Sequence, residues 1–470
     1  MIPGFPERLR AALPAGVREI AAALATAGRR AYLVGGSIRD LLIGRAVTDW
    51  DLATDAHPEE VVRLFARTIP TGIAHGTVTV LPPAGGAFEV TTLRREWGYT
   101  DARRPDGVAF VADVREDLAR RDFTVNAIAA DLATGEIIDP AAGIGDLESR
   151  TLKAVGDARA RFLEDALRPL RAARFVSQLE FELEPATRAA MALPEVHERF
   201  ALLAQERIRD EILKLLASPR PSTAIEILRE AGLLALFLPE LDVCHGEPQN
   251  EYHRYDVYDH TLAVIDAAPS EKPVVRLAAL FHDLAKPGTR EEHGTKVTFY
   301  GHQTAGAEIA ERALTRLRFP NELRDRVVHL VREHMFDYHP VWSDAAVRRF
   351  VRRIGPDAIA DLFDLRIADV MGKGKGGYPV GLEHVRRRIE SVLARRDALS
   401  VRDLAADGTD VMRVGEMPAG PGVGRVLERL LERVLADPSL NNREILLELI
   451  PALAEEETGG PPALRPDTSG

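Results

Sequence analysis

Two aspartates separated by one residue, Asp49 and Asp51, stand in the segment DWDLAT. On a β-strand, residues two positions apart point to the same side of the sheet, so we expect both carboxylates to face one pocket. Such a pair can hold two Mg²⁺ ions, one activating an attacking hydroxyl and the other steadying a leaving pyrophosphate. The pair therefore predicts phosphoryl transfer.

Two glycines precede this pair. Gly35 and Gly36 end the apolar run AYLVGG, directly before a predicted helix whose first turn carries Arg39. Glycines let backbone N–H groups approach a triphosphate, and the helix start adds positive potential. Arg39 can pair with a phosphate. Glu89, in the predicted strand FEVTT, is a candidate third carboxylate, although strand alternation often leaves such a side chain in solvent. Either motif alone is usually a solvated surface feature, but their order and spacing together indicate a nucleotide site.

The segment EDALRPLRAARF offers a second set of charged side chains. Asp165, Arg168, Arg171 and Arg174 follow one another at steps of three, so on a helix they form one winding row. A carboxylate accepts from the exocyclic amine of C or A, and a guanidinium donates to an adjacent ring acceptor. G and U present opposite patterns and would leave charged groups unpaired. The alternative is a solvated face of ion pairs. Pro169 would bend the row, unless the helix starts close to Asp165.

A histidine-rich region follows in the second half of the chain. His260 precedes HDLAK (282–286) by one helix length, and the order of an early histidine, a His-Asp pair and a late aspartate resembles the HD phosphohydrolase superfamily. A lone histidine on a helix is more often an ordinary core or surface residue, but the aligned positions and Lys286 favour a metal site. Such ligands suit Mn²⁺, Ni²⁺, Fe²⁺ or Zn²⁺. The expected ligands of a first metal are His260, His282, Asp283 and Asp369, and those of a second are His302 and His334.

The elements that must position these residues change character along the chain. Residues 5–29 predict one amphipathic helix, and AYLVGG, DWDLAT, TVTVLP and FEVTT predict strands separated by Gly, Pro and polar clusters. From about Phe162 the apolar residues recur at helical spacing. The segments 245–256 and 371–379 are breaks, and the last dozen residues are expected to be disordered.

The glycine pair followed by the aspartate pair matches the pattern of the polymerase-β-like nucleotidyltransferase superfamily. Four further segments resemble successive motifs of class II CCA-adding enzymes and bacterial poly(A) polymerases: EVTTLRREWGYTDARRPDGVAF, EDLARRDFTVNAIA, FLEDALRPLRAARF and QERIRDEILKLL. The resemblance covers essentially the whole chain. It implies a polymerase-like head, a helical neck that binds the incoming nucleotide, and helical body and tail domains that hold RNA.

We therefore expect an α+β fold, in which a polymerase-β-like nucleotidyltransferase head with a small mixed sheet precedes an all-α neck, an HD domain and a tail. The expected segments are an N-terminal helix (1–29), the catalytic head (30–160), the nucleotide- and RNA-binding neck (161–245), the HD domain (246–375), the tRNA-binding tail (376–457) and a disordered end (458–470).

The resemblance also assigns roles to single residues. Gly36 and Arg39 correspond to triphosphate contacts, and Asp49 and Asp51 to metal ligands. The loop at 101–105 corresponds to a flexible element tied to addition of the terminal A. Ribose and phosphate contacts correspond to Arg121, Asp122 and Asn126, the base-reading pair to Asp165 and Arg168, and further phosphate contacts to Arg171 and Arg174.

The implied activity is template-independent addition of CCA, from CTP and ATP, to the 3′ end of tRNA with Mg²⁺ in the head. Addition of A alone, to tRNA or as a poly(A) tail, remains open, as does an HD phosphohydrolase whose head merely binds RNA. For the HD region we expect hydrolysis of a 2′,3′-cyclic phosphate or a nucleotide phosphomonoester. The chain is expected to act as a monomer or a homodimer.

Composition places limits on where and how the chain works. The single cysteine, Cys244, cannot form an intramolecular disulfide, which fits a reducing compartment. No signal peptide and no run of about 20 apolar residues is present, so we expect a soluble cytoplasmic protein without a membrane partner. The net charge of −11 does not exclude RNA, because salt confines the field of a local arginine stripe to about 8–10 Å.

Overall fold

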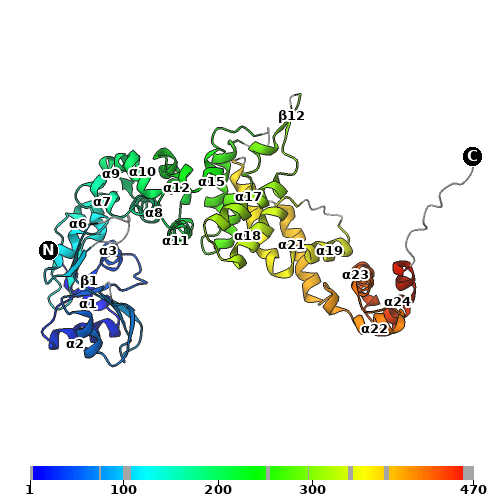
Figure 1. The fold of residues 1–470 in the computed structure, drawn as a ribbon, viewed down its shortest axis with the longest axis horizontal. Coiled ribbons are helices and arrows are strands. Elements are labelled where there is room, and N and C mark those ends of the chain that lie inside the picture. Colours follow the sequence, from blue (N-terminus) through cyan, green and yellow to red (C-terminus); the bar gives the residue numbers. More distant parts are fainter. Residues whose placement is uncertain are drawn as a thin grey trace, which may run out of the picture. The chain divides into compact units, whose positions relative to one another are not determined.

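The computed structural model describes residues 4–73, 76–98, 107–249, 254–294, 296–336, 342–374 and 380–458. The chain divides into two compact units. The first comprises Met1–Glu247 with Arg312–Pro320, and the second comprises Pro248–Glu311 with Asn321–Gly470. The strands of the large sheet all belong to the first unit, and from α7 onward the ribbon is helical apart from short strand pairs (Figure 1).

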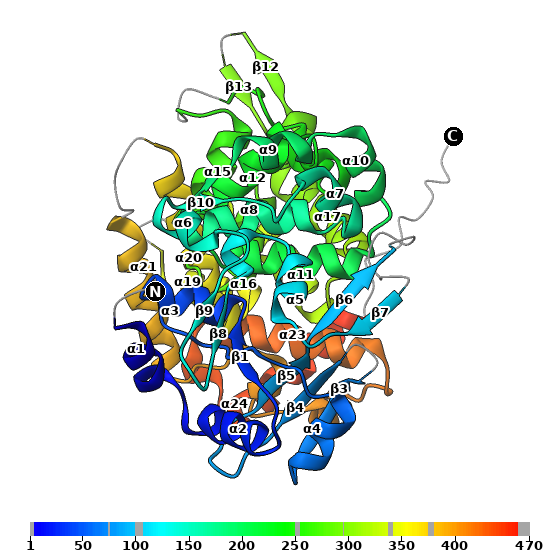
Figure 2. The same ribbon diagram turned by 90° about the vertical axis from the view of Figure 1, so that its left-hand side faces the viewer.

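A seven-stranded mixed sheet forms the base of the first unit, in the order β3-β4-β5-β2-β1-β8-β9 (Figure 2). The central strand β1 (Ala31–Val34) is buried along its whole length. It pairs antiparallel with β2 (Leu52–Thr54), which in turn pairs parallel with β5 (Phe88–Thr92). The predicted strands and small mixed sheet are confirmed. The remaining strands are β3 (Thr68–Gly72), β4 (Thr77–Val80), β8 (Ala129–Asp131) and β9 (Ile137–Ile138).

The N-terminal segment forms two helices, α1 (Phe5–Ala12) and α2 (Ala15–Thr26), so the prediction of one helix over 5–29 is wrong. The break lies at Leu13, whose backbone is extended at ψ 128°. The ring of a proline disfavours the helical conformation of the residue before it, and Pro14 follows directly.

Shorter elements complete the head. The strands β6 (Arg94–Trp97) and β7 (Gly107–Phe110) pair antiparallel in a two-stranded sheet of their own. The predicted loop at 101–105 lies outside the described residues. The other elements are α3 (Gly36–Leu42), α4 (Pro58–Leu64), α5 (Val114–Ala119), the 3-10 turn η2 (Thr124–Asn126), α6 (Gly143–Glu148) and β10 (Thr151–Leu152).

The helical part of the first unit centres on α8 (Arg168–Leu179), which packs on α11 (Gln205–Leu216) and α12 (Pro221–Glu230). Ten of the twelve α8 residues are buried, because α8 is covered by these neighbours as well as by the head. The remaining elements are α7 (Ala158–Glu164), β11 (Glu182–Leu183), α9 (Pro185–Met191), α10 (Pro194–Phe200), α13 (Leu234–Phe237) and α14 (Pro239–Asp242).

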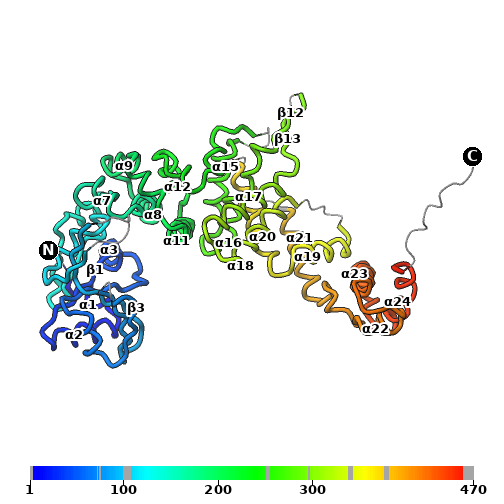
Figure 3. The backbone as a smooth tube through the Cα atoms, in the orientation of Figure 1, coloured from blue at the N-terminus to red at the C-terminus, as the bar shows by residue number. Residues whose placement is uncertain are grey.

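The second unit begins with a bundle in which α15 (Val257–Ala267), α16 (Pro273–Phe281) and α20 (Ile359–Gly372) pack on one another (Figure 3). The second unit also contains α17 (His302–Arg316) up to Glu311, α18 (Asn321–Glu333), the 3-10 turns η3 (Pro287–Thr289) and η4 (Pro356–Ala358), and the hairpin of β12 (Glu291–His293) and β13 (Lys296–Thr298).

The C-terminal helices form a separate apolar cluster and are joined to the bundle by a buried arginine. Arg348, on α19 (Asp344–Ile354), donates to the carbonyl oxygens of Leu435 and Ala436 at 2.7 and 3.2 Å and to Asp397 at 3.1 Å. It thereby caps the end of α23 (Pro421–Ala436). The other tail helices are α21 (Val380–Ala394), η5 (Val401–Asp403), α22 (Gly408–Val414), η6 (Pro438–Leu440) and α24 (Arg443–Thr458). Among the described residues, no helix has both the length and the apolar character that crossing a membrane requires.

Candidate active site and metal centre

A cavity of about 340 Å³ opens in the first unit. It is lined from the sheet, the α5–η2 segment and the start of α8. Residues far apart in sequence thus share one space. Its lining includes seven residues singled out from the sequence: Asp51, Glu89, Arg121, Asp122, Asp165, Arg168 and Arg171.

Asp49 and Asp51 lie just before β2, which begins at Leu52, so the prediction that both stand on the strand is wrong. Asp51 is nevertheless fixed: its N–H donates to the hydroxyl of Ser37 at 2.9 Å, and its carbonyl accepts from the N–H of Val34 at 3.1 Å. Burial and the charge of Asp49 raise the pKa of Asp51 to about 6. The two carboxylates therefore repel each other in a site that a cation would stabilise.

Gly35 makes the close approach around Asp51 sterically feasible. Its φ is +68°, and a Cβ there would lie 3.0 Å from Nη1 of Arg121 and 3.5 Å from Oδ2 of Asp51. Both the conformation and the space favour glycine. Gly36 begins α3. Glu89 lines the same cavity, and its charge contributes to the raised pKa of Asp51, so the structure brings the third candidate carboxylate close to the pair.

A chain of hydrogen bonds joins the predicted ribose and phosphate contacts. Arg39 donates to Oδ1 of Asn126 at 2.7 Å, and Asn126 donates to Asp122 at 3.1 Å. Oδ2 of Asp122 accepts from Nε and Nη2 of Arg171 at 2.9 and 2.6 Å. Burial alone would raise the pKa of Asp122, but the guanidinium of Arg171 holds it well below its usual range.

Glu211, on α11, continues this chain and was not identified from the sequence. It accepts from Nε of Arg174 at 2.6 Å and lies 3.6 Å from Nη1 of Arg171. Its side chain is 3% exposed. Arg174, which we predicted as a phosphate contact, is thus engaged with a buried carboxylate and does not line the cavity.

The base-reading row is not one continuous helix, and that prediction is wrong. α7 ends at Glu164, Asp165 has extended backbone with φ −135°, and α8 begins at Arg168. Pro169 therefore stands in the first turn of α8, where no backbone N–H needs a helical partner. The bend expected from a proline inside the row does not arise.

Each member of the base-reading pair is held by other groups. Nη1 of Arg168 donates to Glu164 at 2.7 Å and to the carbonyl of Arg161 at 2.8 Å, and Nη2 donates to the carbonyl of Arg120 at 3.0 Å. Asp165 accepts from Arg207, which stands 42 residues later on α11. Apart from the presence of Arg207 in QERIRDEILKLL, no local pattern predicted this contact.

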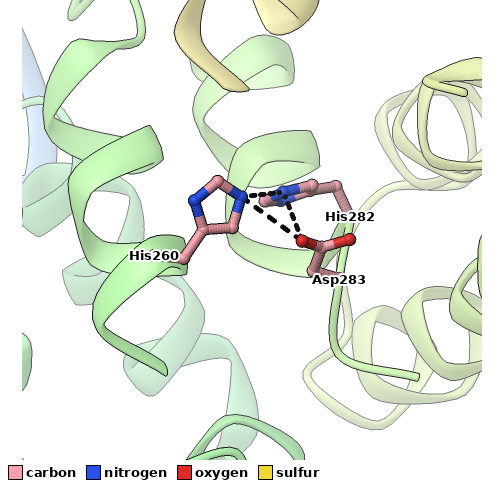
Figure 4. A group of neighbouring side chains, drawn as sticks. All are labelled: His260, His282 and Asp283. Carbon is pink, nitrogen blue, oxygen red and sulfur yellow. Dashed lines mark hydrogen bonds and ion pairs between the residues drawn. The ribbon is translucent and has the colours of Figure 1, made fainter. Parts of the chain in front are cut away.

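The histidines of the second unit gather around the carboxylate of Asp283. Its Oδ2 lies 3.3 Å from Nε2 of His260 and 3.1 Å from Nε2 of His282 (Figure 4). Asp369, on α20, lies 3.3 Å from the same nitrogen of His260. All four side chains are buried. The predicted ligands of the first metal are thus brought together from two helices, α15 and α20, and the turn after α16.

The two predicted ligands of the second metal, His302 and His334, lie near the other carboxylate oxygen of Asp283. Nε2 of His302 is 3.4 Å and Nε2 of His334 is 3.9 Å from Oδ1. His260, His282 and Asp283, and likewise Asp283, His302 and His334, have ligand atoms within 4.8 Å of one another. One carboxylate therefore stands between two histidine pairs.

The hydrogen bonds behind these histidines aim their Nε2 atoms at Asp283. Nδ1 of His282, His302 and His334 lies 2.8, 2.7 and 2.7 Å from a backbone carbonyl oxygen, and that of His260 lies 3.2 Å from one. A ring that donates from Nδ1 presents the lone pair of Nε2, which is the arrangement a metal ligand needs.

Proton affinities differ across the cluster. Burial would lower the pKa of His260, but hydrogen bonds to Asp283 and Asp369 outweigh it and raise the value to about 9. Burial and the neighbouring His282 lower the pKa of His334 to about 3. A cation bound at His260 would replace a proton there.

Sequence models of three domain families match the chain. The Poly A polymerase head domain matches residues 31–153, the probable RNA and SrmB-binding site of polymerase A matches 180–244, and the HD domain matches 252–370. The CCA-adding enzyme of Lactobacillus johnsonii is 36% identical over 465 residues, covering 96% of this chain and 98% of that protein. The chain belongs to the CCA-adding enzyme family. It is accordingly a nucleotidyltransferase, and the resemblance inferred from the sequence is confirmed.

Two further matches, one to a protein sequence and one to a solved structure, support this assignment. The CCA-adding enzyme of Lactobacillus delbrueckii subsp. bulgaricus is 52% identical over 210 residues, which are 45% of this chain and 52% of that protein. The solved structure of the Bacillus stearothermophilus CCA-adding enzyme in complex with CTP is 30% identical, covers 96% of this chain and 97% of its own, and superposes with a TM-score of 0.73. These matches confirm the α+β fold with its nucleotidyltransferase head and helical HD domain.

Proposed function

We propose that the head cavity adds C, C and A to the 3′ end of tRNA from CTP and ATP without a nucleic-acid template. The observation that supports this most directly is that Asp51, Arg121, Asp122, Asp165, Arg168 and Arg171 line one space. Family membership and the CTP complex of the Bacillus stearothermophilus relative agree with it.

Asp49 and Asp51 are the residues that would hold the Mg²⁺ ions on which we propose this family chemistry depends. Their donors are carboxylate oxygens, which Mg²⁺ prefers, and the raised pKa of Asp51, caused by burial and by the charge of Asp49, fits a place where a cation would be favourable. Bound there, the ions would supply activation of the attacking hydroxyl and charge stabilisation of the pyrophosphate. Glu89 is placed to add a third carboxylate.

The remaining residues bind and orient the nucleotide. Gly35 and Gly36 bring backbone close to the triphosphate, and Arg39 and Arg121 offer positive charge beside it. Asp122 and Asn126 are proposed to meet the ribose, since the Arg39–Asn126–Asp122–Arg171 chain holds them in fixed orientation. Arg171 lines the cavity and is proposed as a phosphate contact, whereas Arg174, paired with Glu211 outside the cavity lining, is proposed to support it from the neck.

Base choice is proposed to lie with Asp165 and Arg168, and it can be tested directly. Asp165→Ala should reduce the preference for CTP over UTP by about tenfold to a hundredfold, since a hydrogen bond to a charged group contributes about 1.5–3 kcal/mol. The measurement is kcat/KM for each of the four nucleotides on a tRNA that lacks CCA. A variant that lost activity and still rejected UTP and GTP would make these residues phosphate contacts instead.

Three tRNA transcripts separate CCA addition from its alternatives. They end before CCA, after the first C, and after CC, and each is incubated with labelled CTP or ATP. CCA addition predicts C incorporation on the first two and A on the third. An enzyme that adds only the terminal A would label the third alone, and a poly(A) polymerase would extend all three with many A residues.

A second activity is proposed for the HD cluster, because Asp283 stands between two histidine pairs whose Nε2 atoms converge on it. Histidine and carboxylate together suit Mn²⁺, Ni²⁺, Fe²⁺ or Zn²⁺. A metal pair there would activate water for hydrolysis of a 2′,3′-cyclic phosphate or a nucleotide phosphomonoester. Lys286, whose Nζ lies 2.6 Å from Oδ2 of Asp283, would offset the negative charge of the phosphate.

The domain boundaries predicted from the sequence are retained as a proposal, with the neck ending at 245 and the HD domain at 375. The chain divides between Glu247 and Pro248, and the HD domain model spans 252–370, which supports these limits. We also propose a cytoplasmic location, which fits the single cysteine and the tRNA substrate.

A further inference from the structure

Asp165 is the residue proposed to select the base, and its two carboxylate oxygens accept different numbers of hydrogen bonds. Oδ1 accepts from the N–H of Leu167 at 3.1 Å and from Nη2 of Arg207 at 2.9 Å. Among the described residues, Oδ2 accepts from Nη2 of Arg207 alone, at 3.0 Å. Oδ2 is therefore the oxygen with lone pairs left for an incoming base.

Arg207 and Asp165 differ in their relation to the cavity. Asp165 lines the cavity, whereas Arg207 is not among the described residues that do. The two side chains are only 18% and 22% exposed, so water screens their interaction weakly. Nη1 of Arg207 is buried and, within the described part of the chain, has no hydrogen-bond partner. The guanidinium thus holds both carboxylate oxygens with one nitrogen, and those two bonds are its only side-chain hydrogen bonds among the described residues.

We propose that Arg207 is a positioning residue for nucleotide selection. It keeps the carboxylate of Asp165 turned so that Oδ2 presents acceptor lone pairs to the base edge. A carboxylate held in this way accepts from the amine of C or A, while the carbonyl of U or G at the same place meets oxygen against oxygen. The proposal rests on the base-reading role of Asp165 stated above.

Without Arg207, the carboxylate loses the bond that fixes its rotation. The N–H of Leu167 still binds one oxygen, but the other oxygen can then turn away from the base. Discrimination against U and G should then weaken, although the metal ligands and the phosphate contacts remain in place.

The experiment compares kcat/KM for CTP and UTP on a tRNA that lacks CCA, in the full-length protein. Arg207→Gln should reduce the preference for CTP by about tenfold or more, the effect of losing a charge-assisted hydrogen bond. Arg207→Lys keeps the charge without the planar fork and should fall between this variant and the wild type. Arg209→Gln is the matched control on the same helix, since Arg209 pairs with the exposed Asp210, and it should leave the preference unchanged.

A double variant tests whether Arg207 acts through Asp165. Asp165→Asn should also weaken discrimination, and adding Arg207→Gln to it should produce little further loss. If the losses of CTP preference in the two single variants multiply in the double variant, the inference is overturned. An unchanged CTP preference in Arg207→Gln would also overturn it, even if its Tm falls, because that result describes a purely structural ion pair.

The outcomes separate this inference from the proposed function. If Asp165→Asn still discriminates between CTP and UTP, base reading by Asp165 itself is refuted. If Asp165→Asn loses this discrimination but Arg207→Gln keeps it, only the role of Arg207 is refuted. If Arg207→Gln does not fold, Arg207→Lys decides, since an unchanged preference in that variant overturns the inference.

Discussion

Replacing Asp51 with alanine is expected to reduce nucleotide addition by at least about a thousandfold. The carboxylates of Asp49 and Asp51 are the proposed Mg²⁺ ligands, and a catalytic metal contributes several kcal/mol of transition-state stabilisation. Asp49→Ala should have the same effect. The measurement is single-turnover incorporation of labelled CTP and ATP, on tRNA that lacks CCA, over a range of Mg²⁺ concentrations.

Binding of tRNA should survive in both variants, because nucleic acids dock mainly through phosphate contacts away from these carboxylates. Glu136→Ala is a suitable control, since Glu136 is an exposed acid of the head outside the cavity. A tRNA dissociation constant close to that of the wild type, together with an unchanged Tm, would tie the loss to chemistry. Activity above about a tenth of the wild-type rate in either variant would contradict the assignment.

The second large effect is expected at the HD cluster. Combining His282→Ala with Asp283→Ala should remove bound transition metal and abolish any release of phosphate from a 2′-nucleotide, while CCA addition continues. Asp283 contacts both histidine pairs, so its loss should empty both halves of the cluster. Metal content per chain and phosphate release with Ni²⁺ or Mn²⁺ are measured on the preparation used for nucleotide incorporation.

Two single variants sharpen this test. His302→Ala should lower the metal content by about half, since only one histidine pair is broken, whereas His293→Ala, at an exposed position in β12, should change nothing. Absence of hydrolysis by the wild type with every metal would leave the cluster a structural role. Loss of both activities in a folded double variant would mean that the two sites are coupled.

Local patterns in the sequence were enough to predict most residues of the candidate sites. The strand AYLV, its terminal glycines and the aspartate pair are close in sequence, and backbone geometry over a few residues is enough to bring them together. The histidines could be named because the HD pair fixes the motif and the helical spacing limits the remaining ligands. These inferences depended on short-range chemistry, which a sequence displays directly.

Sequence periodicity misplaced elements where a helix ends early. A helical row over Asp165–Arg174 and a helix over 5–29 both fit the apolar spacing, but Asp165 has extended backbone and Pro14 splits the N-terminal segment. Side-chain spacing reports which face is apolar and does not report where the backbone turns. The aspartate pair shows the same limit, since β2 begins one residue after Asp51.

The sequence by itself thus determined the fold class, the family, and which residues we propose to meet the nucleotide and the metals. Only the tertiary structure decided which partners hold them: Arg207 on Asp165, Glu211 on Arg174, and Asp283 between two histidine pairs. The members of the first two pairs stand 42 and 37 residues apart in the sequence. The packing of α11 on α8 and on the segment just before it brings them within about 3 Å. A contact between distant segments is set by how whole elements pack, and no local pattern encodes it.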